Sequence, residues 1–501
     1  MPDRLGFDRE SIFAEKPRIA LQENIEALCA IFHVPENKDI VLRKFTICGS
    51  NAFVCFLEGL LDPIALSEYV LAPCLLKSET PPVPTDKRLS FVREEVLFAS
   101  QSREVTTFQE ISREILSGMC IMFIDECESA IAIDIRKVPH RLVNRTNNES
   151  VVLGSQEGFV ENLRTNISLV RKNLQSSDLI TEMFDIGNRN ALKAALMYVN
   201  GVTDAQAVNE ARERLLSIDR ETVSGTGQIQ QLIEDHPFSL FPQMLQTERP
   251  DRAAQGLSEG QFAILSENSP YALLAPVTIF HFMHASDDAF MRWQYGSFLR
   301  LIRFLGICLS LFLPAFYIAL TQYHTHLLPM NLLTSIAEAR SNVPFPILGE
   351  ILFMEFSFNL INEAGTRIPS QIGSALGIVG ALILGQAAVS ASIISPILII
   401  IVAITGLGNF AVPSYSMSVA MEIYRLFLLI AGAFFGLYGI VLVTVLMISS
   451  IASMRSFSSP FLSPFAPFRP HNPDLFLRLP IWLQKPFAFY SKKNTGKGTD
   501  E

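Results

Sequence analysis

The last third of the chain contains an apolar stretch, from about Phe304 to Met454, that limits what this sequence can fold into. It holds no Lys and no Asp, and no charged residue lies between Arg367 and Glu422. That interval alone is long enough for two bilayer crossings, because one transmembrane helix needs about 20 apolar residues. A soluble core does not hide so much continuous apolar chain without polar breaks. The pattern predicts an integral membrane protein.

Residues 1–290 have the composition of a soluble region. The chain has 501 residues, and its 49% apolar content is close to the globular average, so the membrane signal lies in where the apolar residues stand. The first residues are polar and charged where a secretory signal would be apolar, so we expect the N-terminal region to stay in the cytoplasm. The net charge of −9 argues against a nucleic-acid partner.

The cysteines are scattered without a C-x-x-C pair, which predicts reduced, buried thiols rather than disulfides or zinc ligands. They are Cys29, Cys48, Cys55, Cys74, Cys120, Cys127 and Cys308. His281-x-x-His284, beside Asp287-Asp288, is a candidate metal site or helix cap, but no third ligand follows at zincin spacing, so we predict no metal. No nucleophile elbow, phosphate loop or H-E-x-x-H motif is present, and we predict neither an enzyme nor a cofactor.

Two similar α/β patterns occur in the soluble region, about 140 residues apart, and suggest two related or packed subdomains. The predicted elements of the first are strands 40–47 and 52–57, helix 106–116, and strands 119–124 and 130–135. Those of the second are helix 252–257 and strands 261–265 and 271–277. Between them, 157–174 forms a basic amphipathic helix that lies on a membrane or packs on its own subdomain.

The predicted fold is therefore an α/β soluble N-terminal region of two subdomains, followed by an α-helical polytopic membrane domain. The expected boundaries are a flexible tail at 1–25, subdomains at 26–150 and 151–290, a membrane domain at 291–454, and a Pro/Phe-rich interfacial and basic tail at 455–501. The first boundary falls in the polar segment 144–154, where the periodicity stops.

The arginines and lysines that flank the apolar stretch predict its topology. Arg292, Arg300 and Arg303 precede it, and a larger basic cluster follows Met454. Positive charge favours the cytoplasmic side, so both termini are expected inside and the number of spans is even. We place four spans near 304–320, 373–392, 394–413 and 426–450, with 321–372 outside or embedded, and 460–490 at the membrane interface.

Two polar stripes in the apolar stretch are candidates for function. On a helix at 345–364, Glu355, Asn359, Asn362 and Glu363 share one side. Carboxylates at membrane depth are costly, so these residues either face water, a partner or an ion path, or belong to an amphipathic helix at the interface.

The second candidate is the predicted span 372–392. Its small residues permit close helix contact, and a separate stripe at helical spacing either lines a narrow pore or packs in the ordinary way. The helix-packing residues are Gly373, Gly377, Gly380 and Gly385. The candidate channel-lining residues are Val379, Ile383, Gln386 and Ser390, together with Glu355, Asn359 and Glu363.

Six segments, in order, resemble the A subunit of GerA-type spore germinant receptors over about residues 110–470. They are EGFVENLRTNISLVRKN at 157–173, LIEDHPFSLFPQMLQTERPD at 232–251, SDDAFMRW at 286–293, LPAFYIALTQYHTHLLP at 313–329, VPFPILGEILFMEFSFNLINEAGTRIP at 343–369 and IGSALGIVGALILGQAAVSASIISP at 372–396. Where the family tends to carry Pro-Arg, this chain has Ser155-Gln156.

The resemblance implies a subunit in the spore inner membrane that works with a transporter-like B subunit and a lipoprotein C subunit. It also implies a homo-oligomer that forms a nutrient-gated channel for monovalent cations, with membrane lipid around it. A late-sporulation paralogue of the A subunit shares most of these motifs and stays open as an identity. A secondary transporter and a non-conducting scaffold are the alternatives from other classes.

The glycine face of the span at 373–385 generates a first prediction. Gly380→Leu adds bulk where helix backbones are expected to approach, so it should disrupt helix packing or oligomerisation. Cross-linking and germination assays of the variant measure both effects. Normal insertion, assembly and germination would mean that this face points to lipid instead.

Overall fold

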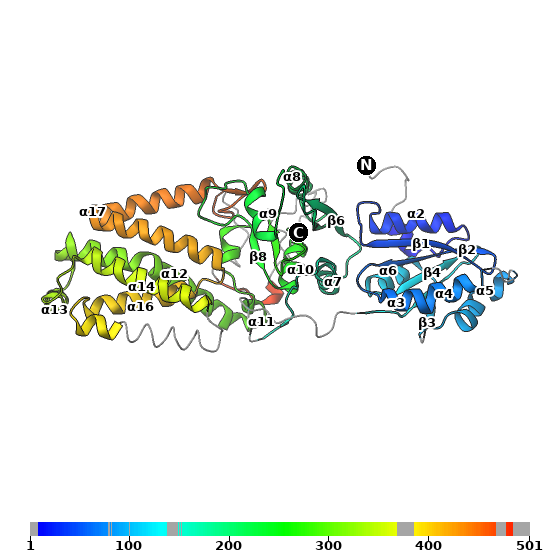
Figure 1. Cartoon of the computed structure of the whole chain (residues 1–501), viewed down its shortest axis with the longest axis horizontal. Coiled ribbons are helices and arrows are strands. Elements are labelled where there is room, and N and C mark those ends of the chain that lie inside the picture. The colour runs from blue at the N-terminus through cyan, green and yellow to red at the C-terminus, as the bar shows by residue number, and fades with distance from the viewer. Residues whose placement is uncertain are drawn as a thin grey trace.

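The computed structural model describes residues 9–78, 81, 83–99, 101–137, 149, 151, 153–367, 385–466 and 477–483. Two α/β units and a bundle of long helices follow one another along the long axis of the molecule (Figure 1). The first unit is blue, the second is green, and the bundle runs from green to orange. The α/β region followed by a helical region agrees with the predicted fold class.

The first unit is a five-stranded antiparallel sheet in the order β1-β2-β4-β5-β3. Its strands are β1 (Ile40–Ile47), β2 (Ser50–Leu57), β3 (Ser102–Val105), β4 (Cys120–Ile124) and β5 (Ala130–Ile133). Side chains alternate between the two faces: Phe53 and Cys55 point toward one buried cluster, and Val54 and Phe56 toward the other. Both faces are therefore covered, which explains why β4 and β5 are buried throughout.

Helices cover each face of this sheet. One face carries α1 (Arg9–Ala14), α2 (Leu21–Phe32) and α6 (Phe108–Leu116). The other carries α3 (Pro63–Ala65), η1 (Leu66–Leu71), α4 (Ala72–Leu76), α5 (Thr85–Phe91) and η2 (Val92–Val96). Helix α6 begins where Thr107 accepts a hydrogen bond from the Glu110 N–H, as an N-cap residue does.

The second unit repeats this topology, with the strand order β6-β7-β9-β10-β8. Its strands are β6 (Leu179–Ile186), β7 (Leu192–Val199), β8 (Leu245–Thr247), β9 (Phe262–Ser266) and β10 (Ala272–Ala275). Helices α7 (Leu163–Asn173) and α10 (Pro250–Ser258) cover one face, and α8 (Ala205–Leu216) and α9 (Thr226–Ile233) the other. The strands and helices predicted in both units are present with small shifts at most ends, but α7 begins at Leu163, six residues after the predicted start at 157.

Matching turns support a common origin of the two units. Gly118 enters β4 with φ 93°, and Gly260 enters β9 with φ 98°, a region that favours glycine. Glu126 and Asn268, just after β4 and β9, have φ 65° and 61°. Equal strand order and equal backbone exceptions at equivalent places favour duplication over chance similarity of two hairpins.

A buried ion pair joins the two units. Arg171 of α7 donates to Asp39 through Nε at 2.7 Å and Nη2 at 3.0 Å, and also donates to the carbonyl of Leu179 at 2.6 Å. The Arg171 and Asp39 side chains are 2% and 7% exposed. The Lys38 N–H adds a backbone bond to the carbonyl of Thr181. Helix α7 is thus packed within the protein, and the membrane-surface interpretation of the basic helix is wrong.

In the described part of the chain, the bundle contains five longer helices, the helical residues 385–390 and short connecting elements. The helices are α12 (Trp293–Gln322), α13 (Met330–Arg340), α14 (Ile347–Arg367), α16 (Pro396–Phe410) and α17 (Tyr415–Ser453). The short elements are η3 (Ile279–Phe282), α11 (Asp287–Phe290), η4 (Thr325–Leu327), β11 (Arg455–Ser456), β12 (Ser459–Pro460) and η5 (Ile481–Leu483). Among the described residues, α12 and α17 are long and apolar enough to cross a membrane, and α16 is apolar but shorter.

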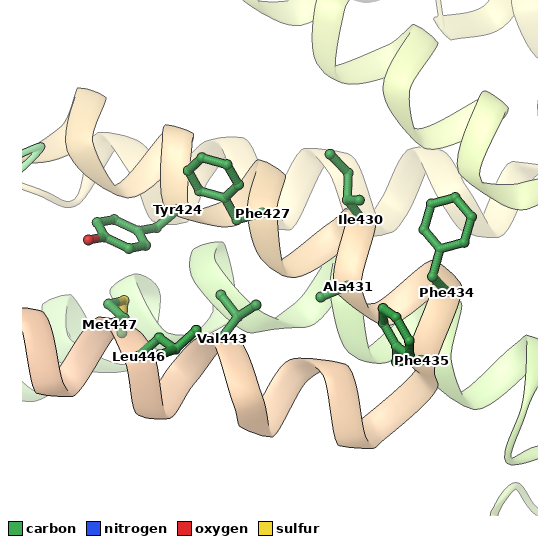
Figure 2. Close-up of a pocket in the computed structure, with 9 residues that line it drawn as sticks. All are labelled: Tyr424, Phe427, Ile430, Ala431, Phe434, Phe435, Val443, Leu446 and Met447. Atoms are coloured by element: carbon green, nitrogen blue, oxygen red, sulfur yellow. The ribbon is translucent and has the colours of Figure 1, made fainter.

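Helix α17 corrects one predicted span. Its chain reverses at Gly436 (φ 60°, ψ −143°), so the predicted single span 426–450 is instead part of two antiparallel arms (Figures 1 and 2). Only glycine adopts this conformation without strain. The arms pack closely because a Cβ at Gly439 would overlap the carbonyl of Ala431, and the Tyr323 hydroxyl caps the turn by donating to Ala433 at 2.9 Å.

The other predicted spans have different outcomes. The first, 304–320, lies within α12, and 394–413 corresponds to α16. Most of 373–392 lies outside the described residues, although 385–390 are helical. In the connection 321–372, the structure places α13 and α14, and α14 packs against α16 within the bundle.

The segment after α17 also differs from its prediction. Strands β11 and β12 form a small hairpin that packs into the second α/β unit rather than lying at a membrane interface. Phe457 is 1% exposed and meets Phe262 edge-on, and the Ser456 hydroxyl donates to the carbonyl of Gln243 at 2.7 Å. Phe461 is fully buried in the cluster under α7 and α10. Residues 467–476 and 484–501 lie outside the described residues.

All seven cysteines lie in the described part of the chain, none of them is in a disulfide there, and five of them are buried. Burial raises the pKa of the Cys74 thiol to about 12, so it stays protonated and unreactive at neutral pH. The prediction of reduced, mostly buried thiols is confirmed.

The joint between the α/β units generates a second prediction. Asp39→Ala leaves Arg171 buried without its carboxylate, a loss of about 3–5 kcal/mol. We expect the first unfolding transition of the purified full-length protein to fall by about 10 °C. Asp185→Ala is the matched control, because the Asp185–Lys193 pair is solvent-exposed and should change stability by no more than about 0.5 kcal/mol. Equal behaviour of the two variants would contradict a stabilising joint.

Candidate functional site

Five polar side chains meet among the apolar helices of the bundle, and we call them the polar cluster. They come from four helices: Ser310 from α12, Glu355 from α14, Asn409 from α16, and Glu422 and Arg425 from α17. Ion pairs and hydrogen bonds join them across helices far apart in sequence. Polar groups this deep in an apolar bundle mark function more often than stability.

Arg425 is the centre of the polar cluster. Its Nη2 and Nε atoms donate to Glu355 Oε2 at 2.8 and 3.1 Å, and its Nη1 atom donates to the Ser310 hydroxyl at 3.2 Å. The Arg425 and Glu355 side chains are 4% and 14% exposed. Since an isolated charge in an apolar medium is very costly, each partner requires the other. The pair fixes α14 against α17, and the serine ties both to α12.

Asn409 and Glu422 form the second half of the polar cluster. The Asn409 amide donates to Glu422 Oε1. Gly408 makes this position possible, because a Cβ there would come within 3.0 Å of Ser310 Cβ and closer still to the Gly306 carbonyl. Two buried acceptors, Glu355 Oε1 and Asn409 Oδ1, have no hydrogen-bond partner in the structure. Such atoms are rare in proteins and costly.

A second buried ion pair lies where α13, α14 and α16 meet. Glu350, whose side chain is 1% exposed, accepts from Arg340 at 3.0 Å and from the Ser395 N–H at 3.1 Å. Ser395 is the N-cap residue of α16, so the carboxylate satisfies a backbone donor at the helix start. This pair fixes the N-terminal end of α16, whereas Asn409 lies at its C-terminal end.

Two of the three arginines before the first span, Arg300 and Arg303, share one buried aspartate. Buried Asp288 accepts from Arg300 at 3.2 Å and from Arg303 at 2.9 and 3.2 Å. Burial alone would raise the Asp288 pKa, but Arg303 and Arg300 outweigh it and hold the pKa below its usual value. The aspartate therefore stays charged and attaches α12 to α11 beneath the second α/β unit.

His281 is a capping residue. Its Nδ1 atom accepts from the Thr278 N–H at 3.1 Å, which forms a capping box at the start of η3. Burial, with Arg252 nearby, lowers the His281 pKa to about 4, so the ring is neutral and able to accept. Among the described residues, no group of three or more His, Cys, Asp or Glu side chains is arranged to hold a metal.

Of the predicted channel residues that the structure describes, Glu355 alone belongs to the polar cluster. Farther along α14, Asn359 and Glu363 are exposed, and so are Gln386 and Ser390. Gly385 is buried, with Ile399 the nearest neighbour of a Cβ at that position. The others, Gly373, Gly377, Gly380, Val379 and Ile383, and the side chain of Asn362, lie outside the described residues.

Sequence reasoning missed Arg425, Glu422 and Asn409. A signal was present, because Glu422 and Arg425 are the only charged residues between Arg367 and Arg455, and they stand at i and i+3. Two opposite charges inside a long apolar run indicate buried partners. Their partners were not readable, because Glu355 lies 70 residues away from Arg425.

An apolar groove runs between the arms of α17 (Figure 2). Tyr424 lies opposite Met447 near one end, and Phe434 and Phe435 stand at the turn. Tyr424 also stacks on Phe241 of the second α/β unit, with ring centroids 4.9 Å apart. The hairpin is thus attached to the α/β region at its open end.

Comparisons with known proteins show the family of this chain. Residues 26–487 match the model of the family described as Bacillus/Clostridium GerA spore germination protein. The chain belongs to the GerA family. Its relatives include spore germination protein A1 of Bacillus subtilis (strain 168), 38% identical over 89% of this chain and 91% of that protein. The uncharacterized membrane protein YfkQ of the same organism is 34% identical over 95% of this chain and 93% of that protein.

One solved structure is similar to this GerA-family chain. It is the N-terminal domain of the A subunit of the Bacillus megaterium spore germinant receptor GerK3, with 25% identity and a TM-score of 0.42, covering 52% of this chain and 97% of that chain. A further relative is spore germination protein KA of Bacillus subtilis (strain 168), 33% identical over 93% of this chain and 87% of that protein. These GerA-family relatives are named for germination or a receptor and not for an enzymatic reaction.

The Arg425–Glu355 pair generates a third prediction. Arg425→Met leaves a buried carboxylate unpaired and should lower stability by about 3–5 kcal/mol. Adding Glu355→Leu removes that charge, so the double variant should be more stable than Arg425→Met alone. Thermal unfolding of the detergent-purified proteins measures this. Arg93→Met is the control, since its pair with Glu94 is exposed and contributes about 0–1 kcal/mol. A double variant less stable than the single one would show that the two residues act independently.

Proposed function

We propose that this GerA-family protein is the membrane subunit of a spore germinant receptor. In this proposal it assembles as a homo-oligomer into a nutrient-gated cation channel in the spore inner membrane, and ion release through it triggers germination. It works with a transporter-like B subunit and a lipoprotein C subunit. The observation that carries the proposal is the polar cluster, held inside a bundle whose outer surface is apolar, in a chain that matches the family almost from end to end.

Exposed apolar side chains support membrane embedding. The bundle presents large apolar residues outward on each of its long helices, among them Leu305, Phe356, Leu407 and Leu442, each more than half exposed. Water would make so large an apolar surface unstable, whereas lipid solvates it. Side chains from this surface are therefore candidates for contact with lipid or with neighbouring subunits.

The path of the chain supports a topology with both termini on the cytoplasmic side. Helix α12 starts next to the second α/β unit, and the hairpin after α17 returns to that unit through Phe457 and Phe461. A chain that enters and leaves the bundle at the same end crosses an even number of times. We retain the proposed division into a tail at 1–25, subdomains at 26–150 and 151–290, a membrane domain at 291–454 and a C-terminal tail.

The alternatives are a late-sporulation paralogue with an accessory role in ion release, and a secondary transporter. The polar cluster favours ion passage over transport of an organic nutrient, because its groups are few, charged and closely packed. Purified protein in liposomes separates the mechanisms. Ohmic cation flux indicates a channel, and saturable substrate uptake indicates a transporter. The absence of both flux and uptake indicates a scaffold.

The predicted pore stripe generates a fourth prediction. If Val379 and Ile383 form a dry constriction, Val379→Ala should wet it and raise the cation leak without nutrient several-fold. Ion release from spores at matched protein level measures the leak. Val441→Ala is the control, because Val441 is 61% exposed on the outer surface of α17 and the same substitution there should leave the leak unchanged. An unchanged or reduced leak in the Val379 variant would remove this residue from the pore.

A further inference from the structure

We propose that the polar cluster is a binding site for one monovalent cation, with oxygen atoms of Glu355, Asn409 and Glu422 as ligands. The inference deepens the proposed channel function, on which its physiological role rests, by assigning a cation site to residues outside the predicted pore stripe. Binding itself is a property of the isolated protein and is testable without flux.

The charge balance of the cluster is the first argument. Glu355 pairs with Arg425, whereas the other carboxylate of the cluster, Glu422, accepts from Asn409. With both carboxylates and the guanidinium ionised, the cluster carries one negative charge in excess. An uncompensated charge among apolar helices is strongly unfavourable, and one bound monovalent cation would bring the net charge of the cluster to zero.

The unpartnered oxygens are the second and independent argument. Asn409 is 6% exposed, and its amide nitrogen donates to Glu422, yet its Oδ1 atom has no partner. The Oε1 atom of Glu355 is likewise buried and unpartnered, while Oε2 receives Arg425. Both atoms are acceptors without a hydrogen of their own. A cation supplies what both lack, and it would recover the free energy lost in burying them.

The end of α16 is the third argument. Asn409 is the penultimate residue of this helix, whose final turn closes with hydrogen bonds from the Ala411 and Val412 N–H groups to the carbonyls of Gly408 and Asn409. The C-terminal end of a helix carries partial negative charge and favours cations. Interrupted membrane helices use such ends, with carbonyl oxygens, to coordinate Na⁺. An all-oxygen set of ligands selects a hard cation, and the single excess charge selects a monovalent one.

Binding of radioactive rubidium to full-length protein in detergent tests the inference directly. We expect saturable binding that K⁺ competes away. We also expect a Tm about 3 °C higher in saturating KCl than in N-methylglucamine chloride of equal ionic strength, because the ligand stabilises only the folded state. N-methylglucamine is the control cation because it is too large for a buried site.

Two variants locate the site. Glu422→Gln removes the excess charge but keeps a side-chain oxygen that accepts from the Asn409 amide. This variant should show no rubidium binding and the same Tm in KCl as in N-methylglucamine chloride. Asn409→Ala removes the unpartnered oxygen and should weaken binding at least tenfold. Glu338→Gln is the matched control, because Glu338 is an exposed carboxylate on α13 and should bind rubidium like the parent protein.

Several results would overturn the inference. One is the absence of saturable rubidium binding together with equal Tm values in the two salts. If Tm then depends on pH alone, a bound proton rather than a metal cation compensates the charge, and the inference is wrong. Another is parent-like binding in both cluster variants. Cation flux without rubidium binding would support the channel proposal and contradict the cation site. Rubidium binding without flux would support the cation site and contradict the channel proposal.

Discussion

The structure of the bundle depends on the cost of placing charge among apolar helices. Arg425 is almost fully buried. Its charge is tolerated there because the guanidinium donates two hydrogen bonds to Glu355 and one to Ser310. That requirement draws three helices to one point. The Glu350–Arg340 pair does the same for α13, α14 and the start of α16. Helix positions in the bundle are therefore set by a few paired charges as well as by apolar packing.

A continuous core links this bundle to the α/β region. The cluster under α7 and α10 includes Phe159 and Phe241 from the second unit, Ile307 from α12, and Met417 and Ile451 from the two ends of α17. The Arg171–Asp39 joint then connects the second unit to the first.

The two α/β units are joined by polar contacts rather than by a shared core. Both faces of each sheet are covered, and the second unit shares its apolar clusters with the bundle rather than with the first unit. What connects them is a directional, charge-based contact around α7. A joint of this kind holds one orientation strongly and is lost when one partner is removed.

The sequence by itself determined the class of the protein and much of its local structure. The apolar distribution indicated the membrane bundle, the alternating runs gave strands such as β1 and β4, and six motifs indicated the family. These signals are local, since helix and strand periodicities depend on neighbours in sequence. Glu355 was predicted as a candidate site residue because a carboxylate in an apolar helix is conspicuous within a few turns.

Only the tertiary structure decided where the chain reverses and which charges meet. Gly436 is one glycine among several in α17, and its turn depends on close packing at Gly439 and on the Tyr323 hydroxyl. The burial of Phe457 depends on a sheet formed two hundred residues earlier. Above all, the partners of Glu355 lie on other helices, and long-range pairing follows from the free energy of the whole bundle rather than from any pattern in one segment.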